Sequence, residues 1–173
     1  KRTDTLPKVN GTAQFALDVQ LDGMLYATVV HSPVFGGKLK SFNEASVNNI
    51  SGVINIFAIE SGLAIVAQNT WAALKAKKQI EINWDEGEAA GLDSEKIRND
   101  MLVASKEKGG VVRKEGNVKK ALKLSENQIE ATYESPLQAH ATMEPMNGTA
   151  FVQRDKCQVW AGTQDPNGAR KIA

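Results

Sequence analysis

Residues 135–170 read SPLQAHATMEPMNGTAFVQRDKCQVWAGTQDPNGAR and hold the densest group of polar side chains in the 173-residue chain. The run TAFVQRDKCQVWAGTQ predicts a β-hairpin, because two extended segments flank the short polar turn at Arg154, Asp155 and Lys156. The second segment ends at Gln164, and Asp165 follows as a predicted helix N-cap, with a proline at the first helical position. The sequence therefore places an amide side chain between a strand end and the start of a helix.

Gln164 stands at a position where proteins often build polar or anion-binding pockets, since a strand end there leads into a helix N-terminus. Strand ends of this kind are also common without any binding role. The spacing therefore leaves open whether Gln164 is functional or only structural. Gln138, His140 and Glu144 precede the hairpin and are further pocket candidates.

His140 and Glu144 have the i, i+4 spacing of two metal ligands on one face of a helix. Pro145 disfavours helix at Glu144, and no third ligand is evident, so we predict no metal held by protein side chains. The chain also has no nucleophile elbow and no Gly-rich phosphate loop.

The preceding chain predicts a small α/β unit with the element order β-α-β-β-α-β. Thr70 is expected to cap a helix with Trp71 and Leu74 on one shared face, which makes this tryptophan a core or interface anchor. The run IEINW alternates, so we expect Ile82 and Trp84 to point inward. Further expected strands and helix caps complete the outline: the strands in residues 25–33, 53–59, 63–67 and 129–133, and the caps Asp93 and Asn117.

Two single residues receive structural interpretations. Cys157 lies inside a predicted strand, so we expect a small buried apolar residue rather than a reactive thiol. His31 ends a strand without a partner histidine nearby, and we expect it to be a half-exposed structural residue.

Composition excludes several classes of function. A net charge of +1, with no basic face carrying aromatic side chains, argues against nucleic-acid binding. One cysteine excludes an intramolecular disulfide and any cysteine-rich metal or iron–sulfur site. No apolar run is long enough for a transmembrane segment, and 42% apolar residues suffice for an ordinary core.

The run PLQAHATMEPMN followed by CQVWAGTQDP resembles the start of the molybdenum-cofactor-binding portion of molybdenum hydroxylase large subunits. This family includes xanthine dehydrogenases and aldehyde oxidases, and the motifs are similar to those of isoquinoline 1-oxidoreductase beta-type and membrane-associated aldehyde dehydrogenase subunits. Earlier motifs, among them LPKVNGTAQFALDV, GMLYATVVHSPVFGGKLKSF and INWDEG, resemble the a/b hammerhead domain that precedes the cofactor domain in that family.

The resemblance implies an α+β (mixed α/β) fold with an a/b hammerhead-like domain over residues 8–86. Residues 87–173 would then be a linker, helices and the N-terminal part of a truncated molybdopterin-binding domain. The chain is thus expected to be a fragment of a longer enzyme that hydroxylates or oxidises an aldehyde or N-heteroaromatic carbon with water-derived oxygen. Gln164 would donate a hydrogen bond to the apical ligand of molybdenum, whereas Gln138, His140 and Glu144 would be pocket or supporting residues.

The resemblance also implies what the 173 residues lack. The general base is expected downstream, so no catalytic residue is assigned here, and we expect no cofactor bound to the fragment alone. The full-length protein would carry molybdopterin, in the cytosine dinucleotide form, and would work with an iron–sulfur small subunit, a cytochrome c subunit and a small-molecule substrate. Localisation stays open between cytoplasm and cell envelope, with the envelope or periplasm favoured. An alternative is a non-catalytic scaffold or subunit-docking module derived from the same family.

Overall fold

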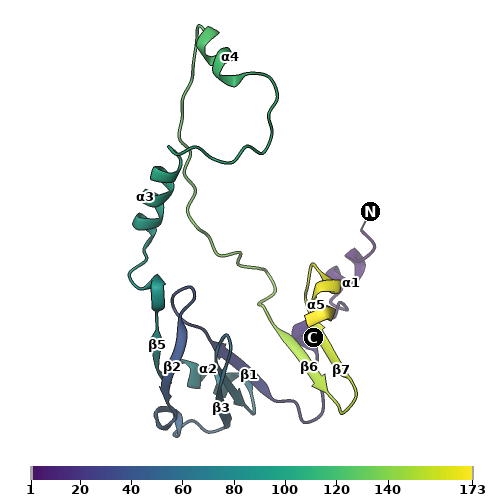
Figure 1. Ribbon diagram of the computed structural model, residues 1–173. Helices are drawn as coiled ribbons and strands as arrows, with labels where there is room; N and C mark the ends of the chain where they lie inside the picture. Colours follow the sequence, from purple (N-terminus) through teal and green to yellow (C-terminus); the bar gives the residue numbers. More distant parts are fainter. Residues whose placement is uncertain (1, 173) are drawn as a thin grey trace. The chain divides into compact units, whose positions relative to one another are not determined.

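The computed structural model describes residues 2–172 and contains both helices and strands, which confirms the predicted α+β class (Figure 1). The strands are β1 (Tyr26–Val30), β2 (Lys38–Asn43), β3 (Val53–Ile59), β4 (Gly62–Ala67), β5 (Glu81–Asp85), β6 (Gly148–Val152) and β7 (Cys157–Ala161). The α-helices are α1 (Thr5–Val9), α2 (Thr70–Gln79), α3 (Ser94–Ala104), α4 (Val118–Leu124) and α5 (Pro166–Ile172). Short 3₁₀ turns are η1 (Ala16–Asp18), η2 (Glu44–Val47) and η3 (Gly87–Ala89).

The described chain divides into two compact units. One is the Met24–Glu130 unit. The other, called here the hairpin unit, combines the described residues up to Gly23 with those from Ala131 onward, and in it η1 packs against β6. The predicted domain boundary at residues 86 and 87 stays a prediction.

A three-stranded antiparallel sheet with the order β1-β4-β3 forms the centre of the Met24–Glu130 unit. The middle strand β4 has the uncharged sequence GLAIVA and is almost wholly buried, with Leu63 and Ile65 at 0% exposure. Its two neighbours satisfy its backbone hydrogen bonds on both edges, so an apolar strand with two buried faces is stable there. Gly62 is required at its start, because a Cβ in this left-handed conformation would collide with the Val30 carbonyl oxygen.

A second, two-stranded antiparallel sheet pairs β2 with β5. In β5 Ile82 and Trp84 are half-buried while the other three residues are exposed, which confirms the predicted alternation. The sequence KLKSFN of β2 was not predicted as a strand, because its lysines mask the short apolar pattern of Leu39 and Phe42. Pairing with β5 determines its conformation.

Helix α2 begins one residue earlier than the sequence indicates. The Asn69 side chain caps it by accepting a hydrogen bond from the Ala72 backbone N–H at 2.9 Å, so the prediction of Thr70 as the cap is wrong. Asn69 has extended backbone angles suited to a cap, whereas Thr70 is the first residue of the helix.

The buried face of α2 consists of alanines rather than of the large apolar residues. Ala72, Ala73 and Ala76 are buried, whereas Trp71 is 74% exposed and Leu74 is also exposed. Small side chains allow the helix to approach β1 and β4 closely, and the wider Trp71 then lies on the opposite face. The expectation that Trp71 is a core anchor is therefore wrong, and an interface role stays a prediction.

The segments after β5 have little packing of their own. Asp93 and Asn117 cap α3 and α4 as predicted, through hydrogen bonds from the Lys96 and Lys120 backbone N–H groups, but neither helix has a buried residue. The strand predicted over residues 129–133 is absent, and Ile129 and Tyr133 are 97% and 94% exposed. The alternating pattern there has no neighbouring strand with which to pair among the described residues.

We expect Leu63→Ala to lower the free energy of unfolding of the Met24–Glu130 unit by about 2–5 kcal/mol, because it leaves a cavity around a fully buried side chain. The matched control Trp71→Ala removes a larger but exposed side chain and should change this free energy by less than about 0.5 kcal/mol. Urea unfolding followed by far-ultraviolet circular dichroism measures both, and a larger loss from Trp71→Ala would contradict the assignment of the core.

Limited proteolysis should cut first in residues 105–117 or 125–147, since these segments are exposed and contain no helix or strand. The residues of β1 to β5 should persist as a resistant product, because their backbone hydrogen bonds lie within the two sheets. Mass spectrometry of the early fragments identifies the sites. Early cleavage inside β3 or β4 would show that the sheet is not the stable part of the chain.

Candidate functional site

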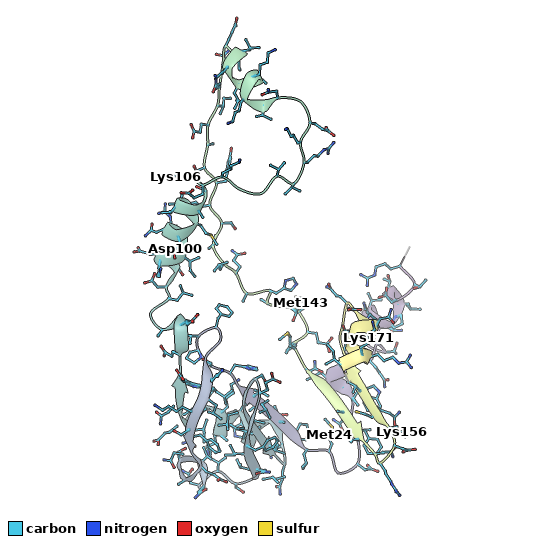
Figure 2. The ribbon with its side chains drawn as sticks, in the orientation of Figure 1. Met24, Asp100, Lys106, Met143, Lys156 and Lys171 are labelled. Carbon is cyan, nitrogen blue, oxygen red and sulfur yellow. The ribbon has the colours of Figure 1, made fainter. Side chains whose placement is uncertain are left out.

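The hairpin predicted over residues 149–164 is confirmed, but its second strand ends at Ala161, three residues before Gln164. Strands β6 and β7 pair antiparallel, from Gly148 opposite Ala161 to Val152 opposite Cys157, and the Gln153 backbone N–H closes the turn by donating to the Lys156 carbonyl oxygen at 2.8 Å. Figure 2 shows Lys156 at the turn between the two strands. The hairpin fixes the direction in which the chain leaves β7 toward the candidate site.

Cys157 is exposed, so the expectation of a buried apolar cysteine is wrong. The physical reason is that β6 and β7 form a sheet of two strands, with no third strand pairing with them in the described part of the chain. A two-stranded sheet covers few of its own side chains.

Hydrogen bonds fix the backbone on both sides of Gln164. The Asp165 backbone N–H donates to Thr163 Oγ1 at 3.0 Å, and Asp165 Oδ1 accepts from the Gly168 backbone N–H at 2.9 Å. The predicted N-cap at the start of α5 is therefore confirmed. A Cβ on Gly168 would lie too close to the Asp165 carboxylate, so a larger residue there would require that side chain to shift.

The Gln164 side chain is exposed, and no group within residues 2–172 hydrogen-bonds its amide. The neighbouring residues thus use their polar groups to hold the backbone, while Gln164 keeps both amide N–H donors and its carbonyl acceptor free. This arrangement suits an amide that binds an external polar group.

Glu144 is the predicted pocket residue that the structure brings to the end of β7. Its Oε1 accepts from Asn147 Nδ2 at 3.2 Å, and a Cβ built on Gly162 would lie 3.4 Å from its Oε2. Gly162 stands two residues before Gln164 in the chain. The side chain of Glu144 therefore lies next to the backbone that carries the candidate amide.

Gln138 and His140 are exposed in a segment without helix or strand, and no hydrogen bond within the described residues joins either one to Gln164. A helix is absent at His140 and Glu144, so the i, i+4 ligand geometry does not arise, and Ala141 between them has a positive φ of 42°. Within residues 2–172, no cluster of three or more His, Cys, Asp or Glu side chains could hold a metal ion.

A charged cluster at α1 lies at the start of the chain rather than at the candidate site. Arg2 and Lys8 each donate to the Asp4 carboxylate at 2.8 Å, and these hydrogen bonds hold the pKa of Asp4 well below its usual value. All three groups are exposed to solvent, so the cluster is best explained as local support for α1.

His31 is exposed, and its Nδ1 lies 2.8 Å from the Ser61 carbonyl oxygen, across the connection between β3 and β4. This contact fits the structural role that the sequence indicates. His31 lies far from residues 135–170 in the sequence, and we do not assign it to the candidate site.

Sequence reasoning missed Asn147, Gly162 and Thr163 as partners of the candidate residues. Two local signals were available: the i, i+3 spacing of Glu144 and Asn147, and a threonine two residues before the Asp165 cap, which is a frequent backbone-bonding arrangement. The approach of Glu144 to Gly162 joins segments on either side of the hairpin and has no local signal.

We expect Asp165→Ala to unwind the first turn of α5, since it removes the acceptor of the Gly168 N–H, a cap worth about 1 kcal/mol. Carbon-13 secondary chemical shifts over Pro166–Ile172 measure this loss. The control Asp155→Ala, in the hairpin turn, should leave those shifts unchanged. Helical shifts that survive in Asp165→Ala would mean that the cap does not stabilise α5.

Comparison with known proteins gives independent information on the same region. Residues 103–173 match the protein family described as Molybdopterin cofactor-binding domain. No helix among the described residues is both long and apolar enough to cross a membrane.

Three curated relatives align along nearly the whole chain. Isoquinoline 1-oxidoreductase subunit beta of Brevundimonas diminuta is 28% identical over 180 residues, which cover 95% of this chain and 22% of that protein. Membrane-bound aldehyde dehydrogenase [pyrroloquinoline-quinone] of Gluconacetobacter polyoxogenes is 25% identical, with coverage of 95% and 22%. The xanthine dehydrogenase molybdenum-binding subunit of Escherichia coli is 24% identical, with coverage of 99% and 28%. The chain thus spans 22% to 28% of the length of these three relatives.

Proposed function

We propose that this chain, which is homologous to part of a molybdenum hydroxylase large subunit, contributes Gln164 to the cofactor pocket of a molybdopterin-dependent oxidoreductase. The observation that carries the proposal is the free amide of Gln164, in the link between β7 and α5, inside the region that matches the cofactor-binding domain. The fixed backbone on either side of Gln164 limits the positions that its amide can reach.

The residues present fit a part of such a pocket. When bound, the molybdenum cofactor would supply a redox-active metal able to accept the electron pair removed from the substrate carbon. Gln164 would donate a hydrogen bond from Nε2 to the bound cofactor. Thr163 and Asp165 form hydrogen bonds that hold the backbone on either side of Gln164.

The proposed reaction is the hydroxylation or oxidation of an aldehyde or N-heteroaromatic carbon with oxygen derived from water. The relatives are named for isoquinoline, aldehyde and xanthine, which supports this substrate range. Because the chain spans 22% to 28% of these relatives, we propose that the general base lies outside the 173 residues and expect no turnover from them alone.

The remaining partners follow from the same proposal. Relatives named as subunits support a multi-subunit assembly. Within it we propose the cytosine dinucleotide form of the cofactor, an iron–sulfur small subunit that receives the electrons, and a cytochrome c subunit beyond it. One relative is named membrane-bound, which supports a position at the cell envelope.

Replacing Gln164 in the full-length protein tests the role of its amide. Gln164→Ala should lower kcat about 10²–10³-fold, or about 3–4 kcal/mol, because it removes one preorganised donor that matters most as charge changes during the reaction. Its KM should change much less. Gln164→Glu nearly preserves the shape of the side chain but replaces a donor with a charged acceptor. Its kcat should fall at least as much as that of Gln164→Ala. Steady-state kinetics with metal analysis of each preparation measure both effects.

His31→Ala is the control and should leave turnover within a few fold, since its only described contact is with the Ser61 carbonyl oxygen. Near-normal kcat for Gln164→Ala at full molybdenum occupancy would refute the role of this amide. A full-length protein that retains its fold but binds no molybdopterin would instead support the non-catalytic scaffold.

A further inference from the structure

Two half-buried side chains interrupt a long exposed segment. Between Ala131 and Asn147 every residue is exposed except Glu144 and Asn147. A carboxylate is costly to remove from water unless its oxygens find partners, so its partial burial in an otherwise solvated segment requires a specific contact.

One carboxylate oxygen of Glu144 is hydrogen-bonded. Oε1 accepts from Asn147 Nδ2, which also donates to the Pro145 carbonyl oxygen at 2.7 Å, so the amide uses both of its N–H donors in this turn. Thr142 Oγ1 adds a hydrogen bond to the Glu144 carbonyl oxygen at 2.7 Å. The turn of residues 142–147 is therefore closed by its own side chains.

Oε2 of Glu144 faces the backbone of Gly162. A Cβ on Gly162 would lie at an ordinary van der Waals distance of 3.4 Å from this oxygen, so alanine would just fit and a branched side chain would displace the carboxylate. Gly162 is the first residue after β7, and the fixed Thr163 and Asp165 contacts follow it. The carboxylate thus supports the start of the short segment that ends in the Gln164 amide.

We propose that Glu144 is a positioning residue for Gln164: its carboxylate, joined to Asn147 and seated against Gly162, holds the chain at the end of β7 in the conformation from which the amide extends. Asp165 holds the other side of Gln164, so the two acidic residues bracket the amide. The catalytic consequence rests on the proposed function of Gln164, whereas the positioning itself concerns contacts within this chain.

The contact between Glu144 and Gly162 can be tested in the 173-residue chain without cofactor. Nitrogen-15 NMR spectra should show shifts of the Gly162 backbone amide and the Gln164 side-chain amide in Glu144→Ala and in Gly162→Val. Gly162→Ala and the hairpin-turn variant Asp155→Ala are the matched controls and should leave the Gln164 resonances in place. Unchanged Gln164 resonances in both Glu144→Ala and Gly162→Val would overturn the positioning role.

Glu144→Gln keeps the shape and an oxygen that can accept from Asn147, so we expect it to restore most of the wild-type spectrum. If the negative charge mattered and the Asn147 contact did not, Glu144→Gln would change the NMR spectrum as much as Glu144→Ala. Such a result would also contradict the proposal.

The full-length enzyme tests the consequence for catalysis. Glu144→Ala should lower kcat about 10–100-fold with little change in KM, as expected when a catalytic group is misplaced by about 1 Å. Added to Gln164→Ala it should cause almost no further loss, because the two substitutions would remove the same interaction. If the double variant instead lost kcat by the product of the two single losses, Glu144 would not act by positioning Gln164. If instead Gln164→Ala alone retains normal turnover, the proposed function is refuted. The NMR experiment still tests whether Glu144 contacts Gly162 and positions Gln164.

Discussion

The pairing of β4 with a strand on each side is the constraint on which the Met24–Glu130 unit depends. Leu63 and Ile65 are fully buried in this strand, and each contributes about 1.5–3 kcal/mol by leaving water. Their burial requires α2 to lie close to the sheet, and only the alanine face of α2 permits that approach. The exposure of Trp71 is thus a direct consequence of how β4 is covered.

Local signals account for the elements that the sequence predicts correctly. The strands β3 and β4 are uncharged apolar runs, and Asp93, Asn117 and Asp165 are caps whose side chains bond within three residues. Strand β2 and the buried face of α2 are different, because each depends on a partner far away in sequence. The pattern of neighbouring residues does not indicate which distant strand or helix an element will pack against.

The residues of the candidate site also fall into two groups: those with a local sequence signal and those whose contacts depend on another segment. Gln164 could be identified from a strand end followed by a cap and, more specifically, from the family resemblance. The approach of Glu144 to Gly162 could not, since it depends on how the turn of residues 142–147 returns to the far end of the hairpin. Gln138 and His140 share the local sequence character of Glu144, yet the described structure gives them no comparable contact.

The hairpin unit is assembled from residues on both sides of the Met24–Glu130 unit, which has a consequence for biosynthesis. On a ribosome that adds ~5–20 residues per second, η1 emerges several seconds before β6, the strand against which it packs. The intervening unit can complete its own sheet during that interval. Phe15, the N-cap of η1, and Leu17 within η1 therefore stay without the strand β6 for as long as the intervening residues are being translated.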